Sequence, residues 1–255
     1  MLGMSLDIPD WLKFRRGAGG GAPFVPTDIS GLSLWLKADD AATVINTGGQ
    51  VDQWNDKSGN SNNATATLTQ RPITGTRTIN SKNAIDFDGS VDIMTLPAGV
   101  LGISAGANTI FVTYQSDNAG DATQQLITMF NGAAGRRYEV AFTATQIQGC
   151  NSNTANTPTT QADTRDTSTK TIGFRRSGTA ITTFVDGVQG TPSALGSDLT
   201  AVSATLGAQT SGVNRFNGLL AEVVWYNSSL SDTDMDRVGN YLNTEWGGGW
   251  TNMGF

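Results

Sequence analysis

The sequence predicts an all-β fold of two packed antiparallel sheets with one C-terminal helix. Short runs of alternating apolar and polar residues recur along the 255-residue chain, and turn signals such as Asp186-Gly187 separate them. Threonine, serine, asparagine and glycine dominate the polar composition, which suits turn-rich β structure. A single stretch near the C-terminus has helical spacing instead. With strands this short and turns this frequent, an antiparallel sandwich is the expected architecture.

The last strand and the helix carry the clearest pattern. Residues 219–226 read as a strand that is apolar on both faces, with Glu222 interrupting the face that carries Leu220, so both faces are expected to be covered. We expect Glu222 to bond buried backbone amides or an arginine. The helix begins at Ser231 or Asp232 and ends at Gly247. Its apolar stripe consists of Met235, Val238, Tyr241, Leu242 and Trp246.

Earlier strands follow from the same alternation. Residues 32–37 form the first strand. Residues 84–89 and 93–96 are expected to pair as a hairpin, and 109–115 and 125–130 to be adjacent strands. Further strands are expected at 137–143, 170–176, 179–185 and 204–209, with a surface loop over 151–169.

The first 30 residues differ from the rest and are predicted to be an arm, followed by one domain over residues 31–255. A short apolar and basic patch precedes a glycine run and two prolines, so the segment is expected to be flexible and then extended. The patch contains Trp11, Leu12, Phe14, Arg15 and Arg16. Two interpretations stay open, a disordered tail and an anchoring arm. We favour the arm, because aromatic residues and arginine are enriched in interface cores.

Composition excludes several classes of function. The chain has no histidine, which removes His-dependent triads and His metal sites, and its single cysteine permits no intrachain disulfide. Charge is sparse and net negative at −6, which argues against nucleic-acid binding. No stretch approaches the ~20 apolar residues that membrane insertion needs. The first twenty residues lack the apolar run of a secretory signal peptide.

Five motifs in order carry a family resemblance. They are GLSLWLKADD (31–40), VDQWNDKSGN (51–60), NAIDFDGS (83–90), FVDGVQ (184–189) and GLLAEVVWYNSSLSDTDMDRVGNYLNTEWG (218–247). Together they resemble the concanavalin A-like, laminin-G-like jelly-roll domains, in particular those of bacteriophage virion proteins and secreted bacterial proteins. The resemblance covers residues 31–250 and implies two antiparallel sheets, one concave, with the first strand near the last. It implies no single function, since one fold hosts many activities.

Some acidic residues are candidates for catalysis or for metal binding. Members of this superfold that cleave glycans look like glycoside hydrolases with clustered carboxylates, but glutamate occurs here only at 139, 222 and 245, each without an acidic residue within three positions. We therefore expect no catalytic residue and no enzyme activity. Asp86, Asp88 and Asp92 are interpreted as turn and strand-end residues, as calcium ligands, or as an acid pair. No cofactor is expected other than this calcium alternative.

Sugar binding would use aromatic platforms and polar loop residues. Trp54, Tyr114, Tyr138 and Tyr226 are candidate platforms, although each lies in an apolar alternation typical of the core. Two interpretations stay open for Arg136-Arg137 and Arg175-Arg176: they bind acidic glycans, or they lie at strand ends in solvent. The sequence selects no ligand-binding residue among them.

The leading hypothesis is a non-enzymatic surface protein of a bacteriophage virion, attached to the capsid or the tail. The arm would dock onto other virion proteins, and the jelly roll would face outward, where host surface glycans are further expected partners. Assembly in the host cytoplasm would need no signal peptide. A homo-oligomer is also expected, because symmetric assemblies are common. The alternatives are a stand-alone carbohydrate-binding module and, third, a glycoside hydrolase.

Overall fold

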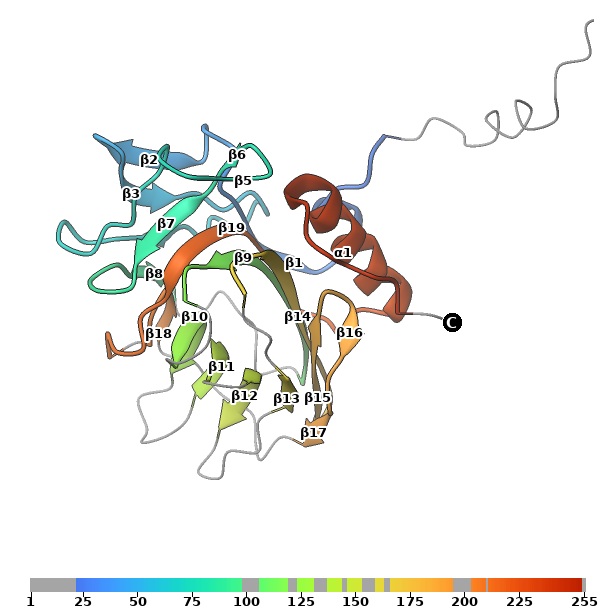
Figure 1. Cartoon of the computed structure of the whole chain (residues 1–255). Coiled ribbons are helices and arrows are strands. Elements are labelled where there is room, and N and C mark those ends of the chain that lie inside the picture. The colour runs from blue at the N-terminus through green and yellow to red at the C-terminus, as the bar shows by residue number, and fades with distance from the viewer. Residues whose placement is uncertain are drawn as a thin grey trace, which may run out of the picture.

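The computed structural model describes residues 22–97, 106–118, 123–130, 137–143, 146–152, 159–162, 166–194, 203–209 and 211–253. Within them the chain forms two large antiparallel sheets packed face to face, and helix α1 (Asp232–Trp246) covers the outer face of one sheet (Figure 1). The predicted sandwich with a C-terminal helix is confirmed.

The first sheet carries the helix. Its strands are β1 (Leu32–Lys37), β7 (Ile85–Asp88), β9 (Ala107–Ser116), β14 (Thr169–Ser177), β15 (Ala180–Val185), β16 (Val188–Gln189), β17 (Ser193–Ala194) and β19 (Asn217–Tyr226). Their order is β1-β19-β9-β14-β15-β16, with β7 also paired to β19 and β17 to β15. The first strand therefore lies beside the last, and Trp35 pairs with Val224.

The second sheet has the order β13-β12-β11-β10-β18-β8-β4-β3-β2. Its strands are β2 (Val44–Thr47), β3 (Gln50–Trp54), β4 (Ala64–Thr65), β8 (Met94–Leu96), β10 (Gln124–Phe130), β11 (Arg137–Phe142), β12 (Gln146–Ser152), β13 (Thr159–Ala162) and β18 (Ser203–Leu206). A ribbon of β5 (Thr78–Ile79) and β6 (Lys82–Asn83) and a 3-10 turn, η2 (Pro26–Asp28), complete the described elements. The loop predicted over 151–169 is wrong in part, because β13 lies within it.

The hairpin predicted from residues 84–89 and 93–96 is also wrong. Strand β7 joins β19 in the first sheet, whereas β8 joins β18 in the second. Between them the chain turns a corner at Asp88, whose Oδ1 accepts from the backbone amides of residues 90–92 at 2.8, 2.8 and 3.1 Å. Gly89 takes φ 69°, a left-handed conformation that glycine adopts readily. This acid-capped corner sends the chain from one sheet to the other.

Residues 109–115 and 125–130 likewise lie in different sheets, so their predicted adjacency is wrong. Strand β9 pairs with β19 and β14, and β10 pairs with β11 and β18. The hairpin of β14 and β15 around Ser177-Gly178 is confirmed, as is the turn at Asp186-Gly187 between β15 and β16. Tight turns with positive-φ residues fix local pairing, whereas longer connections leave it to the packing of the two layers.

Glu222 owes its position to a β-bulge. Tyr114 faces the sandwich interior, since its ring lies 5.0 Å from that of Phe142 in the opposite sheet. Its cross-strand partner Leu220 therefore also points inward, but the next pair is Glu222 with Thr113, and the register shifts between them. The bulge turns Glu222 to the opposite face, toward α1. The alternation that placed Leu220 and Glu222 on one face is wrong here.

Helix α1 begins and ends as the sequence predicts. The Ser231 hydroxyl accepts from the Asp234 amide at 3.1 Å, and Gly247 at φ 72° ends the helix in the left-handed conformation. Gly239, in the middle of the helix, lies so close to Trp250 that an added Cβ would fall 2.0 Å from its ring. The indole in turn packs 5.8 Å from the ring of Phe111 on β9. The C-terminal segment is thereby locked between helix and sheet.

Part of the predicted arm packs on the domain. Pro26 and Ile29 are buried, and the Pro26 carbonyl accepts from the buried Tyr226 hydroxyl at 2.8 Å. The ring of Phe24 contacts α1, 6.0 Å from that of Tyr241. The five proposed anchoring residues, Trp11, Leu12, Phe14, Arg15 and Arg16, lie outside the described residues. No helix in the described ranges has the length and apolar character needed to span a membrane.

Candidate functional site

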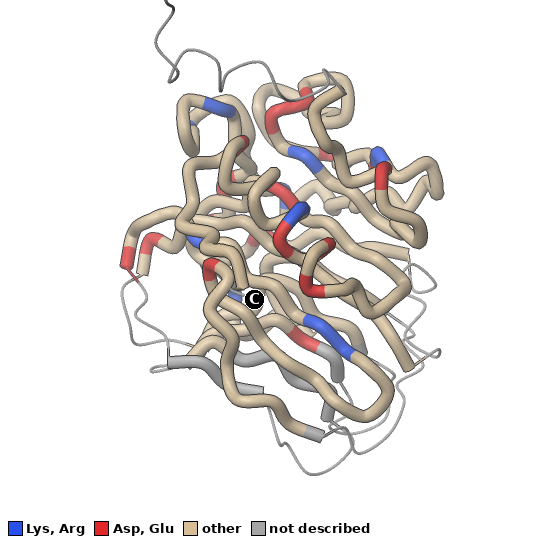
Figure 2. Tube along the Cα trace, turned by 90° about the vertical axis from the view of Figure 1, so that its right-hand side faces the viewer, with Lys and Arg blue, Asp and Glu red and all other residues tan. Residues whose placement is uncertain are grey.

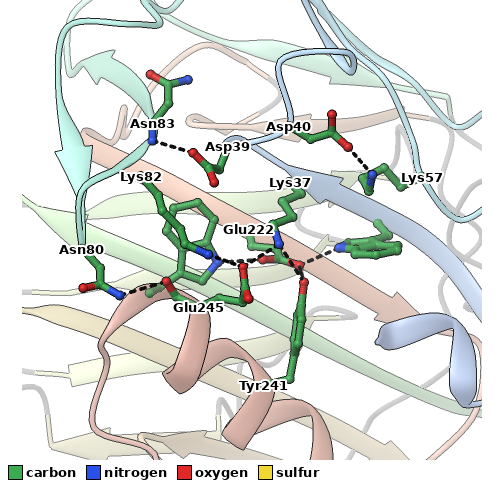
Figure 3. Close-up of polar contacts among 12 residues, drawn as sticks. Lys37, Asp39, Asp40, Lys57, Asn80, Lys82, Asn83, Glu222, Tyr241 and Glu245 are labelled. Atoms are coloured by element: carbon green, nitrogen blue, oxygen red, sulfur yellow. Dashed lines mark hydrogen bonds and ion pairs between the residues drawn. The ribbon is translucent and has the colours of Figure 1, made fainter. Parts of the chain in front are cut away.

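A groove of about 840 Å³ lies where the N-terminal segment, the end of β1 and helix α1 meet. Pockets of this size accommodate small-molecule ligands. Its lining combines aromatic, charged and small side chains: Pro23, Phe24, Val25, Trp35, Lys37, Asp39, Asp40, Ala41, Ala42, Lys57, Arg237, Asn240, Tyr241, Thr244 and Glu245. Figure 3 shows the polar contacts beneath and around it. Only the folded chain unites these residues, which span more than 200 positions of sequence.

Three aromatic rings form the apolar part of the groove. Phe24 and Tyr241 meet edge to face, with the Arg237 guanidinium 4.7 Å from the centre of the Phe24 ring. The Lys57 ammonium lies 5.1 Å from the centre of the Trp35 ring, which is only 8% exposed. Aromatic faces next to cations are favourable contacts and also good surfaces for apolar ligand faces. The groove thus has a rigid aromatic wall.

A single buried carboxylate holds this wall. Glu222 Oε1 accepts from Trp35 Nε1 at 2.5 Å and from the Tyr241 hydroxyl at 2.9 Å, while its Oε2 accepts from Trp246 Nε1 at 2.6 Å (Figure 3). These side-chain donors replace the backbone amides or arginine that the sequence led us to expect. Burial raises the pKa of Glu222, and the three donors and nearby Lys37 oppose that rise. The carboxylate fixes the orientation of two groove rings.

The Tyr241 hydroxyl joins Glu222 to the lysines of the groove. Lys37 Nζ donates to Tyr241 at 3.3 Å and to Glu245 Oε2 at 2.6 Å, and Lys82 donates to the same Glu245 oxygen. Burial and then the neighbouring Glu222 raise the pKa of Tyr241, so its hydroxyl stays protonated. Tyr241 is therefore a neutral hydrogen-bonding group and a poor nucleophile at ordinary pH.

Two carboxylates of the groove rim, Asp40 and Glu245, are held in the ionised form. The hydrogen bond from Lys57 lowers the pKa of Asp40. Partial burial pushes the pKa of Glu245 up, but hydrogen bonds from Lys37 and Lys82 outweigh it and lower that pKa. A general acid needs a carboxyl group that keeps its proton near the working pH. Neither Asp40 nor Glu245 meets this requirement.

Sequence reasoning missed the groove rings but contained one signal for them. In the first strand, Leu34 and Leu36 share one face, and the alternation leaves Trp35 between Ser33 and Lys37 on the polar face. A tryptophan on the polar face of an outer strand indicates a surface that another element or a ligand covers. Tyr241 gave no such signal, because it belongs to the apolar stripe of the helix.

The candidate platforms chosen from sequence lie elsewhere. Trp54, Tyr114 and Tyr226 are 0–1% exposed, in agreement with their interpretation as core residues. The Tyr138 side chain and Arg136 lie outside the described residues, and Arg137 is described only through its backbone in β11. Arg175 forms an ion pair with Asp232, and Arg176 is buried with its Nε donating to the Gly178 carbonyl.

The three acidic residues proposed for calcium support the sheet corner. Asp86 forms an ion pair with Arg77 at 3.1 Å, Asp88 caps the turn, and Asp92 Oδ2 accepts from the Asp88 amide at 2.9 Å. Burial raises the pKa of Asp92 to about 6. In the described part of the chain, no group of three or more acidic, histidine or cysteine side chains is arranged to hold a metal ion. Calcium binding by this trio stays a prediction.

The chain matches no protein-family model and no curated protein, whereas several solved structures resemble it. Domain 4 of AbnA, a GH43 extracellular arabinanase of Geobacillus stearothermophilus solved with arabinotriose, has a TM-score of 0.60 at 14% identity, over 78% of this chain and 94% of that domain. The binding domain of Paraclostridial Mosquitocidal Protein 1 has a TM-score of 0.62 at 11% identity, over 88% of this chain and 56% of that one.

Trypanosoma rangeli sialidase in complex with sialic acid has a TM-score of 0.60 at 14% identity, over 86% of this chain. The chain spans only 34% of the sialidase. The matched parts are β-sandwich domains, which agrees with the resemblance to jelly-roll domains seen in the sequence. At these identities the likeness shows a shared fold, and function has to be argued from the groove.

Proposed function

We propose that this chain is a non-catalytic, glycan-binding β-sandwich domain whose binding site is the groove between Phe24, β1 and α1. The observation that carries the proposal is the pairing of a fixed aromatic wall with polar groups in one groove of ligand size. Sugars present apolar C–H faces and a rim of hydroxyls, so they need both kinds of surface together. Phe24 and Tyr241, which are only partly buried, supply the apolar surface, and the charged rim supplies the hydrogen-bonding groups.

The polar rim suits hydroxyl groups in particular. Each sugar hydroxyl donates one hydrogen bond and accepts others, so it fits between a carboxylate and an ammonium group. Such neighbours occur twice in the groove, as Lys57 with Asp40 and Lys37 with Glu245. Domain 4 of the arabinanase, which was solved with arabinotriose, supports carbohydrate binding as a use of this fold.

The absence of catalysis is part of the proposal. Glycoside hydrolysis generally needs one carboxyl group that keeps its proton and a second that is free to attack or to activate water. In the groove, Asp40 and Glu245 are ion-paired with lysines, and Glu222 is fully buried behind the rings that it orients. Among the described lining residues this leaves Asp39, a single carboxylate where the reaction needs two. The groove residues therefore favour binding over bond cleavage.

A glycan array followed by calorimetric titration of the full chain tests the proposed function. We expect the full chain to bind at least one oligosaccharide and Tyr241→Ala to weaken that binding by about tenfold or more, since a stacking ring is lost. Leu68→Ala, an exposed position outside the groove, is the control and should bind normally. Absence of binding across the array would overturn the function, and unchanged binding by a folded Tyr241→Ala variant would overturn the site.

We further propose that the domain is displayed on a bacteriophage virion. The family resemblance and the patch around Trp11 and Phe14 support this setting, with the patch contacting capsid or tail proteins and the sandwich facing host glycans. The chain enters the domain at Pro23–Val25, on the rim of the groove. Copurification with particles tests this: a chain without residues 1–21 should fold and yet fail to associate. Association of the truncated chain would contradict the anchoring role.

A further inference from the structure

The charges that line the groove cancel. Lys37, Lys57 and Arg237 contribute three positive charges, and the acidic residues Asp39, Asp40 and Glu245 contribute three negative ones. Figure 2 shows acidic and basic positions interspersed on the side of the molecule that α1 occupies, without a broad patch of one sign. A site built for an anionic ligand concentrates uncompensated cations. This groove shows no such excess.

Each of the three cations is also neutralised locally. Lys57 forms an ion pair with Asp40, with side chains 24% and 28% exposed. Lys37 forms one with Glu245 at 2.6 Å, and that carboxylate also binds Lys82. The third cation pairs one turn back along its own helix, Arg237 with Asp234 at 3.0 Å. A ligand carboxylate would have to compete with a protein carboxylate for every one of them.

Beyond these pairs the groove has one further acidic group, Asp39, and beside it one further cation, Lys82, which shares Glu245 with Lys37. The exposed Asp39 carboxylate accepts from the Asn83 amide at 3.1 Å and forms no ion pair with the residues that the structure describes. Glu222 lies directly beneath the ring wall and adds negative charge whenever it is ionised. Both groups repel an anion but do not repel a neutral hydroxyl. Asp39 is also a ready acceptor for such a hydroxyl.

We propose that the groove selects uncharged sugars and rejects glycans that carry sialic or uronic acid at the bound residue. This inference rests on the proposed function and narrows its ligand class. It separates the ligands named for two proteins that contain a similar domain, the neutral arabinotriose of the arabinanase domain and the sialic acid of the sialidase. The stacking wall accepts either kind of ring, so the charge balance of the rim decides between them.

Matched glycan pairs on an array, followed by titration of the full chain, test the inference. Each pair differs only by one terminal sialic acid, as lactose differs from 3′-sialyllactose, or by oxidation of one hexose to its uronic acid. We expect the bound members to be neutral, and the added carboxylate to weaken binding by about tenfold or more. Binding should also be insensitive to salt, because no net charge is neutralised.

The variant Asp40→Asn tests directly whether the charge of the groove rim sets the preference for neutral glycans. It leaves the charge of Lys57 uncompensated and should reduce the preference for the neutral member of a pair at least threefold. Asp52→Asn is the matched control: Asp52 forms a comparable ion pair with Arg71, its side chain is 27% exposed against 28% for Asp40, and it lies outside the groove. The control should keep the full preference.

The outcomes distinguish the two proposals. Preferred binding of acidic members that is lost in Tyr241→Ala would overturn the neutral-sugar inference while leaving glycan binding in the groove intact. An unchanged preference in Asp40→Asn would show that the rim charge does not set it, and would also overturn the inference. Absence of binding to every member would overturn the proposed function itself.

Discussion

Trp35 Nε1 donates to Glu222 Oε1 at 2.5 Å, which joins the first and the last strand of the sandwich across 187 positions of sequence. The same carboxylate binds Tyr241 and Trp246 of α1. Strand, strand and helix therefore meet at one buried acid, and the ring wall of the groove stands directly above it. The geometry of the groove depends on this contact.

Glu222→Gln should destabilise the protein by about 2–4 kcal/mol, since the amide replaces one acceptor oxygen with a donor that faces Trp35, Tyr241 or Trp246. Urea denaturation measures the change. Glu245→Gln, which alters a partly exposed acid on helix α1, should cost less than about 1 kcal/mol. Equal effects of the two variants would show that Glu222 is not a central support.

Gly239→Ala should also destabilise the fold, by about 1–3 kcal/mol, although alanine gains about 1 kcal/mol over glycine in helix propensity. The reason is steric, because the new Cβ would lie 2.0 Å from the Trp250 ring. Thr244→Ala, at an exposed position of the same helix, should be neutral or stabilising. Thermal unfolding checks both, and a stabilised Gly239→Ala variant would contradict the packing described.

Asp92 should make stability fall as pH rises. Burial raises its folded-state pKa from 3.8 to about 6, so the native state holds a proton that the unfolded chain has already released in this range. The stabilisation present below pH 3.8 is therefore lost by about pH 6. Asp92→Asn keeps the acceptor for the Asp88 amide and removes the titration.

The variant's unfolding free energy, measured relative to that of the natural chain at pH 4 and at pH 7, tests this directly. This difference in unfolding free energy should rise by about 2 kcal/mol between the two pH values, because a shift of one pKa unit corresponds to about 1.4 kcal/mol. The same relative stability at both pH values would mean that Asp92 titrates normally in the fold.

Two N-terminal truncations should differ sharply. Removing residues 1–21 leaves Phe24 on Tyr241 and the Pro26 carbonyl on the Tyr226 hydroxyl, so unfolding should shift by less than about 0.5 kcal/mol. Removing residues 1–26 leaves the buried Tyr226 hydroxyl without that acceptor and opens the groove, at a cost of about 1–3 kcal/mol. Urea denaturation of both truncated chains measures their free energies of unfolding. Equal values would show that residues 22–26 contribute nothing to the stability of the domain.

The sequence predicts those elements whose signals are local. The cap at Ser231, the stop at Gly247 and the Asp186-Gly187 turn each depend on a few neighbouring residues, and all three are present in the structure. Partner choice between strands is not local. The short link from β7 to β8 resembles a hairpin turn, yet the carboxylate of Asp88 holds it as a corner between sheets.

The groove was harder to predict, for two physical reasons. Its residues come from four separate parts of the chain, which only the complete fold brings together. In addition, the bulge before Glu222 turns that side chain to the opposite face of the sheet, and the alternation of apolar and polar residues in the strand does not indicate the bulge. Trp35 on the polar face of β1 was the one local indication of a surface feature.

The most direct test of glycan binding in the groove is a crystal structure of the full chain soaked with a neutral oligosaccharide that it binds in titration, beginning with arabinotriose. We predict a sugar ring against Tyr241 and Phe24, with hydroxyls bonded to the rim groups Asp39, Asp40 or Lys37. A sugar bound elsewhere on the sandwich, with the groove empty, would contradict it.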